Sequence, residues 1–108
     1  MKYNIVAIPR FRKELKQLAK KFPSLKTEYA ALIENLEVNP QTGVSLGHNC
    51  HKIRISIASK GKGKSGGGRL ITQFYIEQNT VYLLTIYDKS DQENISDQDL
   101  LTLIQTIK

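Results

Sequence analysis

The first third of the chain carries apolar residues at two different spacings. Residues 3–8 are rich in β-branched and aromatic side chains, which is typical of a short strand. From Pro9, which suits a first helical turn because it has no N–H to leave unpaired, apolar residues recur at helical spacing. Pro23 breaks this pattern, and Ser24 can cap a second helix that ends at Asn39–Pro40. The pattern therefore predicts a strand followed by a helical hairpin.

The second half of the chain changes to a spacing of two. One side of a predicted strand carries Ile53, Ile55 and Ile57, and the other side carries Lys52, Arg54 and Ser56. Residues 69–77 and 81–87 read as two more strands joined by a turn, whereas residues 41–50 and 58–68 read as loops. Ser96 and Asp99 form a capping box that opens a last, amphipathic helix.

The resulting order, β-α-α-β-β-β-α, predicts one α+β domain over residues 1–108. In this fold an N-terminal strand and a helical hairpin pack on an antiparallel β-sheet, with helices on one face. No apolar run approaches the roughly 20 residues of a membrane helix, and no signal peptide is evident. The single cysteine, Cys50, cannot form an internal disulfide. We therefore expect a cytoplasmic protein without membrane association.

Positive charge is concentrated in the middle of the chain. The net charge is +6, and residues 1–37 and 77–108 together contain as many acidic as basic residues. The whole excess comes from a segment without any acid, and its carriers are Lys52, Arg54, Lys60, Lys62, Lys64 and Arg69. Such an uncompensated segment predicts a site for a polyanion, with RNA as the first candidate. Alternation places Lys52, Arg54, Arg69 and Tyr87 together on the sheet face opposite the core.

The remaining basic residues lie in a Gly/Lys/Ser loop. Residues 58–65 fit a loose phosphate-loop pattern, but a strand follows them, whereas nucleotide binding of that type requires a helix there. We instead predict that the loop contacts a nucleic-acid backbone through Lys60, Lys62, Lys64 and Ser65. His48 and His51 beside Cys50 do not complete a set of four metal ligands, so we predict neither a metal nor a cofactor.

Three stretches of the sequence, residues 46–55, 59–72 and 82–89, together resemble the RelE/ParE toxin superfamily. They are most similar to HigB-like toxins of the RelE type, which carry a lysine-glycine loop before an arginine. The resemblance covers nearly the whole chain in element order and implies a RelE-like fold. It also implies a toxin of a type II toxin–antitoxin system, with a cognate antitoxin as its partner. RelE-type members cut mRNA in the ribosomal A site, whereas ParE-type members inhibit DNA gyrase.

The resemblance also implies roles for individual residues in an endoribonuclease, or mRNA interferase, that needs no metal. By position, Lys52 and Arg54 match the paired basic residues on the first meander strand, and Arg69 matches the arginine after the loop. Arg69 would stabilise transition-state charge, and Lys52 is the candidate base because like charges around it favour the neutral amine. Lys89 stands in for a further arginine. Because the family's C-terminal tyrosine is absent, Tyr87 is a candidate for stacking on a base.

Three hypotheses about function remain open at this stage. The first is a ribosome-dependent mRNA interferase, which the lysine loop favours because its backbone and ammonium groups suit RNA phosphates. The second is a non-enzymatic, ParE-type inhibitor of DNA gyrase. The third is an antitoxin-paired module without activity of its own.

Overall fold

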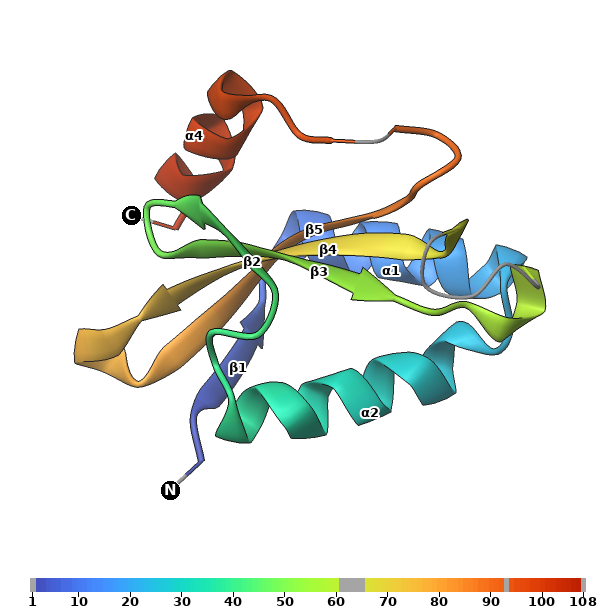
Figure 1. Ribbon diagram of the computed structural model, residues 1–108, viewed down its shortest axis with the longest axis horizontal. Coiled ribbons are helices and arrows are strands. Elements are labelled where there is room, and N and C mark those ends of the chain that lie inside the picture. Colours follow the sequence, from blue (N-terminus) through green and yellow to red (C-terminus); the bar gives the residue numbers. More distant parts are fainter. Residues whose placement is uncertain (1, 61–65, 93, 108) are drawn as a thin grey trace.

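The computed structural model describes residues 2–60, 66–92 and 94–107. Its elements are β1 (Asn4–Ala7), α1 (Pro9–Lys21), α2 (Leu25–Val38), β2 (Val44–Gly47), β3 (Cys50–Ile55), the 3-10 turn η1 (Ala58–Lys60), β4 (Gly68–Tyr75), the 3-10 turn η2 (Ile76–Gln78), β5 (Thr80–Asp88) and α4 (Asp97–Gln105). The strands form one sheet in the order β1-β5-β4-β3-β2 (Figure 1). The predicted α+β class is thereby confirmed. None of the described helices is long and apolar enough to cross a membrane.

The N-terminal strand pairs with the last strand of the sheet. β1 runs parallel to β5, with Ala7 opposite Leu83, whereas the other neighbouring strands are antiparallel. α1 begins directly after β1, with a proline in its first turn as predicted. Past the end of β1, the Glu14 carboxylate accepts the Thr85 hydroxyl at 2.7 Å and the Ile86 N–H at 3.3 Å. The Glu14 side chain thus accepts hydrogen bonds from the part of β5 that lies beyond its pairing with β1.

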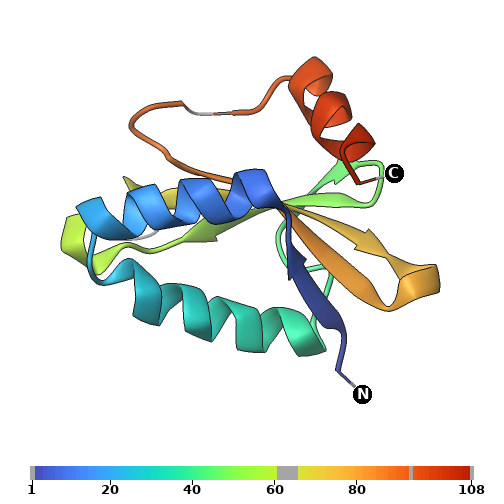
Figure 2. The same ribbon diagram turned by 180° about the vertical axis from the view of Figure 1, so that it is seen from behind.

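The helices α1 and α2 lie on one side of the sheet (Figure 2). Phe11 of α1 and Leu25 and Leu36 of α2 are fully buried in the core. Ser24 precedes α2 but, contrary to prediction, its side chain does not cap the helix. Its hydroxyl donates to Glu28 at 3.0 Å and accepts the Ser59 N–H at 2.9 Å. The side chain is therefore used to bind the helical hairpin to η1.

One strand was not predicted. The segment 41–50, read as a loop, contains β2, which pairs antiparallel with β3. The turn between them places His48 and Asn49 at left-handed φ angles of 55° and 60°. β2 is only 4 residues long, and three of them are exposed. Alternation over Val44, Ser45 and Leu46 is too short to be told from chance, so this strand gives no usable periodic signal.

The second face of the sheet is partly covered, which corrects the prediction that helices occupy one face only. Figure 1 shows α4 on the other side of the sheet from α2. α4 begins as predicted, since the Ser96 hydroxyl accepts the Asp99 N–H at 3.1 Å. Its residues Leu101 and Ile104 border a hollow together with Gln73 and Tyr75 of β4. The helix therefore covers one end of this face, whereas Arg54 toward the other end is exposed.

A bulge in β5 changes which of its side chains share a face. The register with β4 shifts between Ile71 and Thr72, so that Leu84 is an extra residue on β5. Tyr82 pairs with Gln73 and Tyr87 pairs with Arg69, which places both tyrosines on the second face. Simple alternation along β5 would place Tyr82 and Tyr87 on opposite faces, and the bulge is the reason that they share one. The prediction that Tyr87 lies on the second face was right, because Tyr87 lies beyond the bulge.

Candidate functional site

The predicted basic residues meet in two adjacent rows on the second face. In one row, Arg54 of β3 lies opposite Arg69 of β4, and Arg69 lies opposite Tyr87 of β5. In the next row, Lys52 lies opposite Ile71. Like charges directly opposite one another on neighbouring strands destabilise a sheet. A sheet that nevertheless places two arginines opposite each other is suited to binding an anion between them.

The three cations of these rows differ in exposure. Arg54 is exposed, Lys52 is half-buried, and Arg69 is only 4% exposed. The Arg69 guanidinium donates to the carbonyl of Gly68 at 2.9 Å, and the Lys52 ammonium donates to the side-chain oxygen of Asn94 at 2.8 Å. Within the described part of the chain, neither Lys52 nor Arg54 forms an ion pair. Arg54, being exposed, can meet an incoming anion directly.

Tyr87 is buried beside Arg69. Burial raises the pKa of its phenol, and the positive charge of Arg69 acts in the opposite direction. The phenol is therefore neutral at pH 7. Tyr87 is 7% exposed, and its hydroxyl has no hydrogen-bond partner among the described residues. A ring with so little exposed face cannot stack on a base, so the stacking role predicted for Tyr87 does not fit this structure.

Lys60 does not belong with the other loop lysines, which corrects its assignment as an RNA contact. Its side chain is 7% exposed, and its ammonium forms an ion pair with Asp88. Hydrogen bonds and charge from Lys60 and Ser90 lower the pKa of Asp88 despite the opposing effect of its burial. Lys89, next to Asp88, is half-buried, and its N–H donates to the carbonyl of Gly67 at 3.1 Å. The residues Lys62, Lys64 and Ser65 lie outside the described part of the chain.

Sequence reasoning missed the polar partners Asp88 and Asn94. Asp88 is only 3% exposed, although aspartates are mostly found at the surface. Its only sequence signal is its place at the end of the last strand, directly after Tyr87. Asn94 lies 42 residues from its partner Lys52, in a stretch without periodicity. In the described residues no cluster of three or more His, Cys, Asp or Glu could hold a metal ion.

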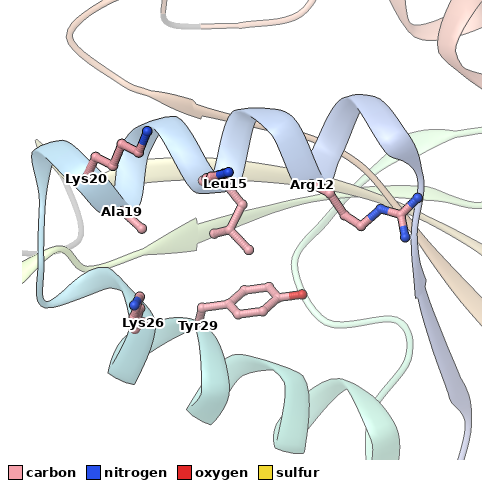
Figure 3. Close-up of a pocket in the computed structure, with 7 residues that line it drawn as sticks. Arg12, Leu15, Ala19, Lys20, Lys26 and Tyr29 are labelled. Atoms are coloured by element: carbon pink, nitrogen blue, oxygen red, sulfur yellow. The ribbon is translucent and has the colours of Figure 1, made fainter.

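A separate hollow of about 430 Å³ lies between the two long helices (Figure 3). Leu15 and Ala19 of α1 and Tyr29 of α2 point into it, and burial raises the pKa of Tyr29. The other residues that line it are basic, namely Arg12, Lys16, Lys20 and Lys26. Arg12, Lys16 and Lys20 recur every fourth residue of α1, a spacing that the sequence analysis did not single out. This hollow lies on the helical side and contains none of the predicted site residues.

The fold is shared with solved structures of RelE toxins. The similarity to a mutant of the E. coli toxin RelE in its free state has a TM-score of 0.66 at 16% identity, and it covers 100% of both chains. The toxin–antitoxin complex RelBE2 from Mycobacterium tuberculosis matches with a TM-score of 0.56 at 17% identity, over 84% of this chain and 95% of that one. The intact E. coli RelBE complex matches with a TM-score of 0.51 at 21% identity, over 80% and 95%. At these identities the similarity establishes a RelE-like fold.

The sequence itself establishes the family. Residues 11–107 match the family model of the RelE toxin of the RelE/RelB toxin–antitoxin system. The chain belongs to the RelE toxin family, and is therefore a toxin of a toxin–antitoxin system with an antitoxin as its partner. The resemblance to the RelE/ParE superfamily is confirmed, whereas the HigB-like branch stays a prediction.

Proposed function

We propose that this toxin inhibits translation by cutting mRNA on the ribosome. In the proposed reaction the 2′-OH of a ribose attacks the adjacent phosphate, and the products are a 2′,3′-cyclic phosphate and a 5′-OH. The observation that carries the proposal is the pairing of Arg54 with Arg69 across β3 and β4, on a face that Lys52 shares. On this proposal Arg54 meets the incoming phosphate directly, and the buried Arg69 engages it only once binding has exposed its side chain.

The strongest requirement of this reaction is stabilisation of the negative charge that builds up on the phosphorane. Arg69 fits this role because its guanidinium is almost completely shielded from water, where charge interactions are stronger. Arg54 is exposed and can engage the same phosphate from the neighbouring strand. Guanidinium groups present paired donors that match phosphate oxygens. Together the two arginines can hold the phosphate and its developing charge.

The reaction also requires proton transfer from the 2′-OH and to the leaving oxygen. Lys52 is the candidate base. Its partner, the Asn94 amide, carries no charge, so a bound substrate can replace this partner without breaking an ion pair. Lys89, which follows the end of β5, remains the candidate for a further cation. Tyr87 packs opposite Arg69 as a neutral phenol and leaves the charge of the guanidinium intact.

The proposed partners are the ribosome and mRNA in the cytoplasm, besides the antitoxin. Lys62, Lys64 and Ser65 remain the candidates for contact with RNA backbone, now without Lys60. The lysines would act mainly through charge, so ribosome binding should weaken as salt increases. A charge reversal at Lys62 and Lys64 should make this salt dependence less steep.

The test is a reconstituted translation reaction in which the 5′ ends of mRNA fragments are mapped. The wild-type toxin should produce cuts in register with codons, and only when ribosomes are present. Arg54→Ala should abolish them, whereas the matched control Lys13→Ala removes an exposed cation of α1 and should leave them intact. Intact mRNA with wild-type toxin would refute the proposal. Inhibition of supercoiling by purified DNA gyrase would then favour the ParE-type alternative.

A further inference from the structure

The ammonium group of Lys60 is completely occupied by acceptors from within the protein. It donates to the carbonyl of Gly66 at 2.7 Å, to the hydroxyl of Ser90 at 3.2 Å and to the carboxylate of Asp88, and it lies 3.4 Å from the carbonyl of Gly67. An ammonium has three donors, so these four acceptors leave none for a phosphate. With its side chain 7% exposed, Lys60 is not placed to contact RNA.

The acceptors of Lys60 come from two segments that flank the candidate site. Gly66 and Gly67 precede Arg69 by only a few residues at the start of β4. Asp88 follows Tyr87 directly, at the end of β5, and its Cα lies opposite that of Gly68. One ammonium therefore joins the two strand ends from which Arg69 and Tyr87 project.

The two strand ends also approach each other unusually closely. A Cβ added at Gly68 would lie 3.2 Å from the backbone oxygen of Tyr87 and 3.1 Å from the side chain of Ile55. A side chain at Gly68 would force these neighbours to move by a few tenths of an ångström, and the hydrogen bond from the Lys89 N–H to the Gly67 carbonyl spans the same point. Small changes at this point would therefore shift Arg69 and Tyr87 relative to each other.

Lys60 also connects these strand ends to the helical layer. Its ammonium lies 5.6 Å from the ring centroid of Phe22, the residue that ends α1. The preceding residue, Ser59, exchanges two hydrogen bonds of 2.9 Å with Ser24 in the turn between the helices. Contacts with Phe22 and Ser24 of the helical hairpin therefore help to fix the position of the Lys60 ammonium beside the sheet.

We infer that Lys60 and Asp88 form a buried pair that positions Arg69 and Tyr87 for the reaction and does not bind RNA. This inference rests on the proposed function. A buried ion pair contributes little net stability, because the cost of removing both charges from water offsets their attraction. The pair instead constrains the structure, because the Lys60 ammonium can bind Gly66 and Asp88 together only when the ends of β4 and β5 lie close to each other. The pair therefore acts on catalysis through Arg69 and does not touch the substrate.

The test separates the rate of cutting from ribosome binding. Lys60→Met keeps most of the side-chain length and removes the ammonium, and Lys13→Met is the matched control on an exposed face of α1. With ribosomes in excess, Lys60→Met should reduce the cleavage rate constant about tenfold to a hundredfold, as expected for a misplaced catalytic group. Its ribosome affinity and the salt dependence of that affinity should match those of Lys13→Met. Weaker and less salt-dependent binding with an unchanged rate would overturn the inference.

A second variant guards against misfolding caused by an unpaired buried charge. Lys60→Met/Asp88→Asn removes both charges and should unfold close to the wild-type temperature. It should nevertheless keep the reduced rate constant, because the link through the Lys60 ammonium is then missing. A double variant that cuts at the wild-type rate would show that the pair positions nothing.

A measurement independent of cleavage distinguishes failure of this inference from failure of the proposed function. The Lys89 amide, bound to the Gly67 carbonyl, should exchange its hydrogen faster in Lys60→Met than in wild type. Unchanged exchange would overturn the positioning role. If wild-type toxin cuts no mRNA, the proposed function fails, and the exchange experiment still decides whether Lys60 holds the strand ends.

Discussion

Arg54 on β3 and Arg69 on β4 are direct cross-strand partners, although both carry a positive charge. Arg54 is exposed, whereas Arg69 is almost completely buried. Arg54 can contact a phosphate at the protein surface, and Arg69 could contact the same phosphate only from below the surface. Like charges opposite one another on neighbouring strands disfavour the sheet, and under the proposed function a bound phosphate would offset this repulsion.

Removing the exposed member of this pair, Arg54, should abolish cleavage without lowering the free energy of unfolding. Arg54→Ala relieves the repulsion, so the free energy of unfolding should stay constant or increase by up to about 1 kcal/mol. Ribosome-dependent cleavage should nevertheless be lost. Chemical denaturation and fragment mapping on the same sample test both parts. A loss of stability that accounts for the loss of activity would contradict this prediction.

The ion pair of Asp88 should make stability sensitive to acid. The folded protein holds the pKa of Asp88 below its ordinary value of 3.8, so the unfolded chain binds this proton more readily. The contribution of Asp88 is fully present above that ordinary value and is lost as the pH falls through the lower, folded pKa.

Replacement of this carboxylate by an amide tests the pH dependence. Asp88→Asn leaves the Lys60 ammonium buried without its counter-charge, which should cost about 3–5 kcal/mol at pH 7. This difference from wild type should narrow as the pH is lowered below 4. Melting temperatures of both proteins between pH 2.5 and pH 7 provide the measurement, roughly covering the range of ordinary carboxylate titration. A difference in melting temperature that stays constant across this range would mean that titration of Asp88 does not cause the acid sensitivity.

The reciprocal hydrogen bonds of Ser24 and Ser59 should couple the helical hairpin to η1. Each serine N–H donates to the hydroxyl of the other at 2.9 Å. Ser24→Ala should cost about 0.5–1.5 kcal/mol of unfolding free energy, because it removes the acceptor of the exposed Ser59 N–H. In a double-mutant cycle, Ser24→Ala and Ser59→Ala should cost less together than the sum of their separate costs. Additive costs would show that the two residues act independently.

Cys50 should be unreactive in the folded toxin. Its side chain is fully buried, and burial raises the pKa of the thiol to about 11. Because the thiolate is the reactive form, alkylation by iodoacetamide at pH 8 should be slow in native protein and fast in denaturant. Mass spectrometry over time gives both rates. Rapid labelling of native protein would indicate that β3 opens near Cys50.

The sequence by itself determined the elements whose signal is local. Helical spacing predicted α1 and α2, and a spacing of two predicted β3 and the shared side of Lys52 and Arg54. The capping box at Ser96 predicted where α4 begins. These patterns can be read locally because side-chain direction repeats every 3.6 residues in a helix and every two in a strand. The family resemblance then supplied an interpretation for the basic face, and the family it named was confirmed.

Only the tertiary structure decided which elements meet. The parallel pairing of β1 with β5, the bulge at Leu84 and the position of α4 depend on contacts between distant segments. Lys60 and Lys62 look alike in the sequence, yet Lys60 meets a carboxylate 28 residues away and is buried with it. Whether a lysine binds a partner or the protein's own chain depends on what folding places beside it, because burial makes an unpaired charge too costly to keep.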